Sequence, residues 1–237
     1  MKVREKTLWM LLALAVAGCG GAGDAAEDEA MAGEEQGAAV AEDPDIAPAG
    51  ESTGLPAGFE LRLDNADATA ADYRVMDMGG TLHVQTGPAG ILYNASNTAT
   101  DADFEATAEF TEVGAPADHR EAYGIFVGGS DLQGAGQQYT YFVIRATGEY
   151  LIKRRQGEET TTVVDWTAAP AITASTGGAD LTNALSVRKQ GETVHFLING
   201  TEVTTVPAAD IDTNGMAGVR VNHNLNVMVN GWTFSTM

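Results

Sequence analysis

The stretch TVHFLINGTEVTTV, residues 193–206, decides the fold class, because two apolar runs flank an Asn-Gly pair. Val194, Phe196 and Ile198 occupy every second position, which is the spacing of side chains on one face of a β-strand. Asn199-Gly200 suits a two-residue hairpin turn, in which both central residues need positive φ. The stretch therefore predicts two antiparallel strands joined by a tight turn.

The same alternation recurs through the rest of the chain. In FEATAEFTE, residues 104–112, Phe104, Ala106, Ala108 and Phe110 fall on one face, and the other face carries Glu105, Thr107, Glu109 and Thr111. Thr147-Gly148 and Gln190-Gly191 are further turn signals, and no helical periodicity exceeds a turn or two. Strands are expected at residues 59–63, 73–77, 80–86, 90–94, 104–112, 121–128, 138–145, 149–155, 160–166, 184–189, 192–199, 201–206, 216–221 and 226–235. This pattern predicts an all-β, two-sheet antiparallel jelly-roll sandwich.

Several segments also follow one another in a characteristic order. They are DFEATAEF (103–110), YGIFVGG (123–129), YTYFVIR (139–145), GEYLIK (148–153), NALSVR (183–188), HFLINGTEV (195–203), GMAGVRV (215–221) and WTF (232–234). Their order resembles the concanavalin A-like lectin/glucanase superfamily, and is most similar to its laminin-G-like and 3-keto-disaccharide-hydrolase-like domains. The resemblance covers residues 57–237 and implies two curved antiparallel sheets. Because this superfamily includes sugar-binding modules, hydrolases and adhesion domains, the resemblance does not select a function.

The N-terminus has the order of a lipoprotein signal. A basic start precedes the apolar run LWMLLALAVA, residues 8–17, which is too short to span roughly 30 Å of hydrocarbon. VAGC, residues 16–19, then resembles the lipobox of bacterial lipoproteins, which implies a signal peptide at residues 1–18 and an acylated Cys19 at the new N-terminus. Two or more acyl chains anchor a protein stably to a membrane. Gly20, in place of Asp, implies sorting to the outer membrane; an ordinary secretory signal with a chance cysteine is the alternative.

Residues 19–56 are expected to form a disordered tether after the signal. After Cys19 they contain ten acids and no Lys, Arg or aromatic residue, so they have little apolar surface to bury and repel one another. An acidic metal-collecting tail is the alternative. Residues 57–237 are long enough for one domain. The net charge of −20 argues against nucleic acid as a partner, because phosphate binding needs clustered Lys and Arg.

Catalytic motifs are missing from residues 57–237. In the glucanase branch that the chain resembles, a Glu-x-Asp-x-x-Glu strand supplies the carboxyl pair, but no such pattern occurs here and residues 139–145 contain no acid. Cys19 is the only cysteine, which excludes a cysteine nucleophile from the domain. We therefore expect a membrane-anchored, extracytoplasmic binding module for a carbohydrate. A hydrolase of the 3-keto-disaccharide type and a structural or adhesion lipoprotein remain alternatives.

Calcium is the one cofactor that the resemblance suggests, because laminin-G-like domains often hold Ca²⁺ with carboxylate and carbonyl oxygens. The candidate ligands are Asp64 and Asp67 in DNAD, and Asp210 and Asp212 in DIDTN. Short acid clusters also arise by chance in so acidic a chain.

The hairpin of residues 138–155 supplies a candidate glycan-binding face. If Thr147-Gly148 forms a two-residue turn, Arg145 lies opposite Tyr150, and one face carries tyrosines that stack on sugar rings and arginines that pair with carboxylates. That face comprises Tyr139, Tyr141, Arg145, Tyr150 and Arg154. The other face is assigned to the core: Phe142, Ile144 and Leu151. The alternative is that the tyrosines themselves belong to the core.

A polar loop offers a second set of candidate ligand-binding groups. Asn222, His223 and Asn224 carry amide and imidazole groups that can hydrogen-bond sugar hydroxyls. A plain polar turn is the alternative.

Overall fold

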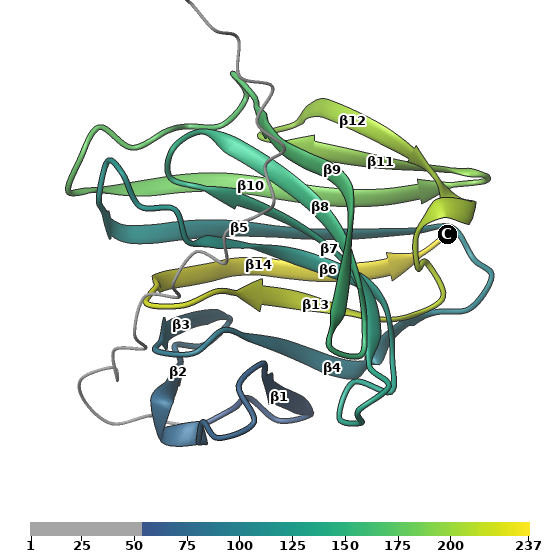
Figure 1. The fold of residues 1–237 in the computed structure, drawn as a ribbon, viewed down its shortest axis with the longest axis horizontal. Helices are drawn as coiled ribbons and strands as arrows, with labels where there is room; N and C mark the ends of the chain where they lie inside the picture. The colour runs from purple at the N-terminus through teal and green to yellow at the C-terminus, as the bar shows by residue number, and fades with distance from the viewer. Residues whose placement is uncertain (1–53) are drawn as a thin grey trace, which may run out of the picture. The chain divides into compact units, whose positions relative to one another are not determined.

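Two antiparallel sheets of seven strands pack face to face, so the domain is a jelly-roll sandwich, as the strand pattern predicted (Figure 1). The structure is a computed structural model that describes residues 54–237. The predictions for residues 1–53, including the signal peptide, Cys19 and nearly all of the tether, lie outside the described residues.

Each predicted strand is present, with ends that differ by a few residues. Sheet A contains, in spatial order, β1 (Phe59–Leu63), β4 (Gly90–Ala99), β13 (Gly215–Val221), β6 (Ala122–Ser130), β7 (Gln138–Arg145), β8 (Glu149–Gln156) and β9 (Glu159–Ala168). Sheet B contains β12 (Thr201–Pro207), β11 (Thr193–Ile198), β10 (Ala179–Gln190), β5 (Phe104–Ala115), β14 (Asn226–Thr236), β3 (Thr81–Thr86) and β2 (Tyr73–Asp77). In Figure 1, β8 and β9 of sheet A cross in front of sheet B.

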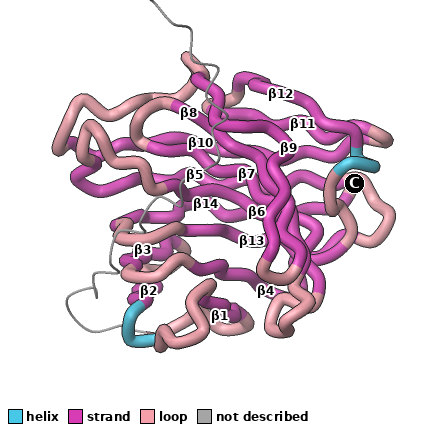
Figure 2. Tube along the Cα trace, in the orientation of Figure 1, coloured by secondary structure: helices cyan, strands magenta, loops and turns pink. Residues whose placement is uncertain are grey.

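Helical structure in residues 54–237 is limited to two short 3₁₀ turns, η1 (Ala70–Asp72) and η2 (Ala208–Asp210), drawn in cyan in Figure 2. Within that part of the chain, no helix has the length and apolar character needed to cross a membrane.

The Asn-Gly hairpin has the predicted conformation. Asn199 has a φ of 50° and Gly200 a φ of 77°, and they connect β11 to β12. Val194, Phe196 and Ile198 are all buried in the core between the sheets. The Phe196 ring lies 5.2 Å from that of Phe142 on β7, centroid to centroid, so side chains of the two sheets interlock directly.

The loops of two other hairpins differ from the prediction by one residue. The β7–β8 loop consists of residues 146–148, and Arg145 pairs with Glu149. Gly148, with a φ of 90°, donates its N–H to the Arg145 carbonyl at 3.0 Å, which fits a three-residue loop with glycine at the left-handed position. The β10–β11 turn keeps the predicted length of two residues but is shifted by one: Gln190 pairs with Thr193, which leaves Gly191 and Glu192 in the turn.

This extra loop residue changes the face on which β8 side chains lie. Side chains alternate between faces, so a shift of one residue exchanges the two sets. The prediction that Tyr150 and Arg154 share a face with Tyr139, Tyr141 and Arg145 is therefore wrong. Leu151, assigned to the core, lies on that outer face instead.

A buried carboxylate stabilises one end of sheet B. Glu112 on β5 has a side chain only 2 % exposed, and its Oε1 lies 2.8 Å from Nδ1 of His119 in the loop that leads to β6. This hydrogen bond raises the pKa of His119, against the opposing effect of burial, and Glu121 and Asp118 raise it further.

The contact predicts that stability depends on the charge of His119. Because the folded state raises the pKa of His119, the stabilisation is complete below the unfolded pKa of about 6.5 and is lost as pH rises through the folded value. The unfolding free energy of wild type, relative to Glu112→Gln, should therefore fall between pH 6 and pH 8.5 in urea titrations. Glu202→Gln, which alters the more exposed His195–Glu202 pair, is the matched control and should show a weaker trend. Parallel pH curves for wild type and Glu112→Gln would contradict the interpretation.

Candidate functional site

Sheet A carries a second apolar cluster on its outer face, the face turned away from sheet B. On β6, for example, Tyr123 and Ile125 pack in the core between the sheets, whereas Ala122 and Phe126 belong to the outer cluster. The full outer cluster is Ile91, Tyr93, Ala122, Phe126, Leu132, Tyr139, Tyr141, Val143 and Leu151. Because the outer face of an antiparallel sheet is commonly polar and solvated, an aromatic-rich cluster here marks the face as specialised.

Arg220 on β13 lies at the centre of this face. Its partner across the β13–β6 pairing is Gly124, which has no side chain, so the Arg220 side chain can extend over β6 as far as β7. There Nη1 donates to the hydroxyl of Tyr139 at 3.0 Å, and Cζ lies 4.9 Å from the centre of the Tyr141 ring. Burial raises the pKa of Tyr139 and of Tyr141, so both hydroxyls remain protonated at neutral pH.

Asp64 holds two arginines together above the sheet. Following β1, it accepts hydrogen bonds at 2.6 Å from Nη2 of Arg220 and at 3.1 Å from Nη1 of Arg155 on β8. Since β1 and β8 stand first and sixth in sheet A, these side chains converge over the middle of the sheet. Burial by itself raises the pKa of Asp64, but Arg220 and then Arg155 outweigh it and lower the pKa from 3.8 to about 2.

A stacked arginine–tryptophan pair extends this surface toward β9. We call the surface the floor of the outer face, and it comprises Asp64, Tyr139, Tyr141, Arg145, Arg155, Trp166 and Arg220. The Cζ atom of Arg145 lies 4.0 Å from the centre of the Trp166 ring. Glu149 orients the guanidinium, because Nη2 and Nε donate to its Oε2 at 2.6 and 2.8 Å. Trp166 is half-buried, so part of the indole remains in contact with solvent.

Lys153 on β8 completes the set of cations. It lies directly across from Tyr141 in the β7–β8 pairing and is partly exposed. Among residues 54–237, no hydrogen bond or ion pair engages its ammonium group. Sequence reasoning missed Lys153, Arg155, Trp166 and Arg220 as members of one face, because only the strand order places them together.

The predicted binding residues divide between two sides of sheet A. Tyr139, Tyr141 and Arg145 lie on the outer face, buried rather than open. On the opposite side, the Tyr150 hydroxyl donates to the Val203 carbonyl at 3.3 Å, and Arg154 forms a two-point ion pair with Asp212 at 2.7 and 2.8 Å.

The Asn222–His223–Asn224 turn follows β13 and is held by the backbone. Asn222 N–H donates to the Ala122 carbonyl, and Asn224 N–H donates to the Gly87 carbonyl. The charge of His223 contributes to lowering the pKa of Asp64, so the turn lies at the margin of the charged floor.

The acids predicted as calcium ligands do not come together. Asp64 is engaged by arginines, and both carboxylate oxygens of Asp212 accept hydrogen bonds from Arg154. Asp67 and Asp210 are exposed, on separate segments. Within residues 54–237, no three His, Cys, Asp or Glu side chains are grouped so that they could hold a metal ion.

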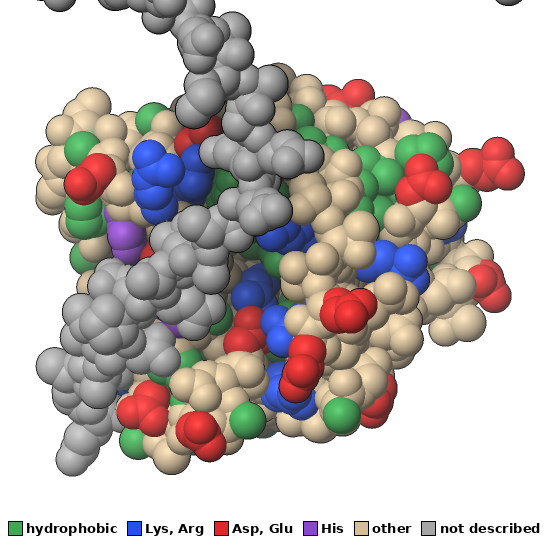
Figure 3. All heavy atoms as spheres, viewed as in Figure 1, with side chains coloured by type: hydrophobic (Ala, Val, Ile, Leu, Met, Phe, Trp, Pro, Cys, Tyr) green, Lys and Arg blue, Asp and Glu red, His purple; other side chains and the backbone are tan. Residues whose placement is uncertain are grey.

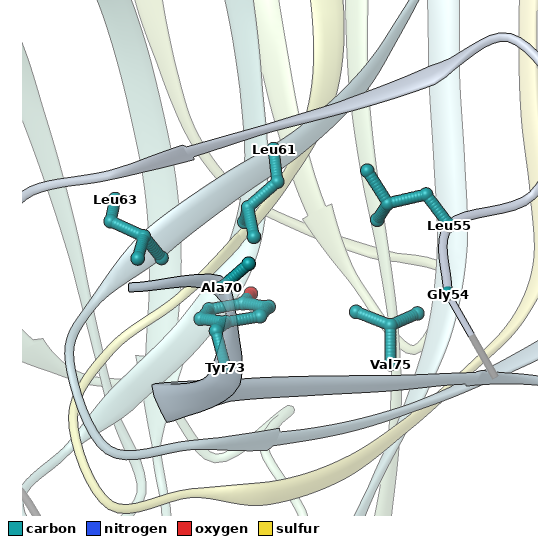
Figure 4. A pocket seen from close by; sticks show the side chains of 7 residues that line it. All are labelled: Gly54, Leu55, Leu61, Leu63, Ala70, Tyr73 and Val75. Atoms are coloured by element: carbon teal, nitrogen blue, oxygen red, sulfur yellow. The ribbon is translucent and has the colours of Figure 1, made fainter. Parts of the chain in front are cut away.

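A separate apolar hollow opens at the edge of the sandwich between β1 and β2 (Figure 4). It has a volume of about 300 Å³ and is lined by Gly54, Leu55, Leu61, Leu63, Ala70, Tyr73 and Val75. The Tyr73 hydroxyl is the only polar side-chain group in this lining. Because several polar groups are normally needed to orient a ligand such as a sugar, the outer face of sheet A is the better candidate site.

The geometry predicts that Asp64 contributes to the stability of the folded domain. Asp64→Asn should lower the unfolding free energy by about 2–4 kcal/mol, because it leaves two largely buried guanidinium groups without their carboxylate. The lowered pKa adds a second expectation: Asp64 stabilises wild type above pH 4, and this contribution disappears as pH falls from 3.8 toward 2. Urea titrations at pH 7 and pH 2.5 measure both effects. Asp67→Asn, an exposed neighbour, is the matched control, and an equal loss in the two variants would contradict the assignment.

Comparison by sequence gives no relative: no family model matches the chain, and no curated protein matches it. Solved structures do match. The carbohydrate-binding module CBM66 from Bacillus subtilis has a TM-score of 0.54 and 12 % identity, over 75 % of this chain and 95 % of the module.

Two further solved structures are also similar in fold at low sequence identity. A Bacillus subtilis protein of unknown function with a galectin-like fold has a TM-score of 0.53 and 11 % identity, over 74 % of this chain and 88 % of that one. Basic winged bean lectin with Tn-antigen has a TM-score of 0.50 and 12 % identity, over 79 % and 95 %. At these identities the similarity establishes the fold alone, a jelly-roll sandwich of two antiparallel sheets.

Proposed function

We propose that this domain is a carbohydrate-binding module whose ligand lies on the outer face of sheet A. The carrying observation is the arrangement of side chains on that face: Asp64 fixes Arg220 and Arg155, the Arg220 guanidinium lies over the Tyr141 ring, and Trp166 stacks on Arg145. Aromatic rings provide flat apolar contact for sugar rings, and guanidinium forks recognise their polar substituents. Similar folds in a carbohydrate-binding module and a lectin support the proposal.

The floor is pre-organised, which favours binding. Asp64, Tyr139 and Glu149 already hold the arginine side chains in place, so little side-chain entropy remains to be lost when a ligand arrives. The charged groups also retain solvent contact: the side chains of Asp64 and Arg155 are 17 % and 13 % exposed. Figure 3, which views this side of the domain, shows Lys and Arg side chains grouped with acids there.

Membrane attachment through Cys19 is the second part of the proposal. The lipobox-like VAGC sequence supports acylation, and Gly20 supports outer-membrane sorting. Residues 20–56 then provide a spacer of roughly 30–35 Å root-mean-square length between membrane and domain, if they behave as a flexible chain. Such a spacer would let the domain reach glycans beyond the bilayer surface.

Glycan binding is tested with the full chain carrying Cys19→Ser, screened against a glycan array. We expect binding, and Trp166→Ala should weaken it at least tenfold, because an aromatic contact at the floor is lost. Trp232→Ala is the matched control: Trp232 is also partly buried but belongs to β14 in sheet B. It should leave affinity unchanged.

A reducing-sugar assay on the same glycans examines the hydrolase alternative. Product formation would favour an enzyme, whereas binding without product supports a module. If no glycan binds, or if both tryptophan variants lose affinity equally, the proposed site is wrong.

Attachment is tested by cell fractionation of the producing bacterium. Cys19→Ser removes the thiol that acylation needs, so the protein should move from the membrane fraction to the soluble fraction. Ala22→Ser, which lies beyond the lipobox-like sequence, is a control and should remain with the membrane. A membrane-bound Cys19→Ser variant would contradict the lipid anchor.

A further inference from the structure

Two cationic groups on the outer face of sheet A have donors that no described residue accepts. Arg220 uses Nη1 and Nη2 for Asp64 and Tyr139, but its buried Nε has no hydrogen-bond partner. The ammonium group of Lys153 makes no hydrogen bond or ion pair within residues 54–237. A buried donor without an acceptor is costly and uncommon in folded proteins, so the unpaired Nε–H, next to the partly exposed side chains of Asp64 and Arg155, suggests that a ligand supplies the acceptor.

These two groups lie close to the same aromatic ring. The guanidinium of Arg220 is stacked over Tyr141, with Cζ 4.9 Å from the ring centre. Lys153 is the direct cross-strand partner of Tyr141, and paired residues of neighbouring strands have Cβ atoms about 5 Å apart. Arg155 comes two residues later on the same face of β8 and shares Asp64 with Arg220. Three cations therefore surround Tyr141, and Asp64 is the carboxylate that pairs with two of them, Arg155 and Arg220.

The excess of positive charge is specific to this face. Residues 54–237 contain 22 acids and 10 Lys or Arg residues. Five of the ten bases lie on the outer face of sheet A: Arg62, Arg145, Lys153, Arg155 and Arg220. Three acids accompany them: Glu60, Asp64 and Glu149. In a strongly acidic domain, this local reversal of sign produces a potential that attracts anions to one surface.

We infer that the ligand of this face carries an anionic oxygen group, a carboxylate or a sulfate, that binds beside Tyr141, between Nε of Arg220 and the ammonium group of Lys153. The inference rests on the proposed carbohydrate-binding function and specifies the class of glycan: an acidic one. A hydroxyl can accept one hydrogen bond from Nε but leaves the positive charge of Lys153 uncompensated. An anionic oxygen group accepts from both donors and forms the shorter, stronger charge-assisted hydrogen bonds.

The experiment uses the full chain with Cys19→Ser and matched pairs of ligands in isothermal titration calorimetry. Oligogalacturonate is compared with its methyl ester, sialyllactose with lactose, and a heparin oligosaccharide with its desulfated form. We expect at least one anionic member to bind ten or more times more tightly than its neutral or less charged counterpart. The pair that shows the difference distinguishes a carboxylate ligand from a sulfate.

Lys153→Gln identifies the site. It should weaken binding of the anionic member about tenfold, leave a neutral counterpart unchanged, and reduce the dependence of affinity on salt between 50 and 500 mM. Lys189→Gln makes the same change on β10 of sheet B and should have no effect on affinity. Thermal unfolding checks that both variants remain folded.

The possible outcomes separate this inference from the function on which it rests. Preference for neutral ligands, or an equal effect of Lys153→Gln on the anionic and the neutral member of a pair, overturns the acidic-glycan inference and leaves carbohydrate binding in place. If no ligand of the panel or of the glycan array binds, both proposals are wrong.

Discussion

The ion pair between Arg220 and Asp64 is the interaction on which the outer face of sheet A depends. A guanidinium with a side chain only 8 % exposed is tolerated only when its charge is compensated, and Asp64 provides two of its hydrogen bonds. The same carboxylate fixes Arg155, and Arg220 in turn binds the Tyr139 hydroxyl and covers Tyr141. One acid that follows β1 therefore orients side chains contributed by three other strands. An ionic contact of this kind specifies position more than it adds stability.

Sheet A differs from a simple sandwich layer because its middle strands are buried on both faces. Tyr123, Ile125 and Phe142 pack toward sheet B, whereas Phe126, Tyr139 and Val143 form the outer cluster. This explains why β6 and β7 read as nearly continuous apolar runs, while β5 and β11 show clear alternation. The proposed site lies on the outer cluster, where Arg220, Arg155 and Lys153 combine charge with an aromatic surface.

The fold and the proposed function rest on different observations. Jelly-roll sandwiches occur in proteins with many different functions, so the similarity to CBM66 and to winged bean lectin describes only the fold. The argument for an acidic glycan comes instead from this chain: the unpaired Nε of Arg220, the unpaired Lys153 and the concentration of bases on one face of an acidic domain. None of these observations depends on the identity of a structural neighbour.

The sequence by itself determined the strands, the sandwich class and the Asn199-Gly200 turn, because strand periodicity and turn stereochemistry are local properties of the chain. It was insufficient for the β7–β8 register, because Thr147-Gly148 suits a two-residue or a three-residue loop, and this single residue decides the face of Tyr150 and Arg154. Even less of the candidate site could be predicted from the sequence. Tyr139, Tyr141 and Arg145 could be chosen from one hairpin, but Asp64, Lys153 and Arg220 become neighbours only through the order β1-β4-β13-β6-β7-β8. Strand order depends on long-range packing between segments more than a hundred residues apart, and local periodicity carries no information about it.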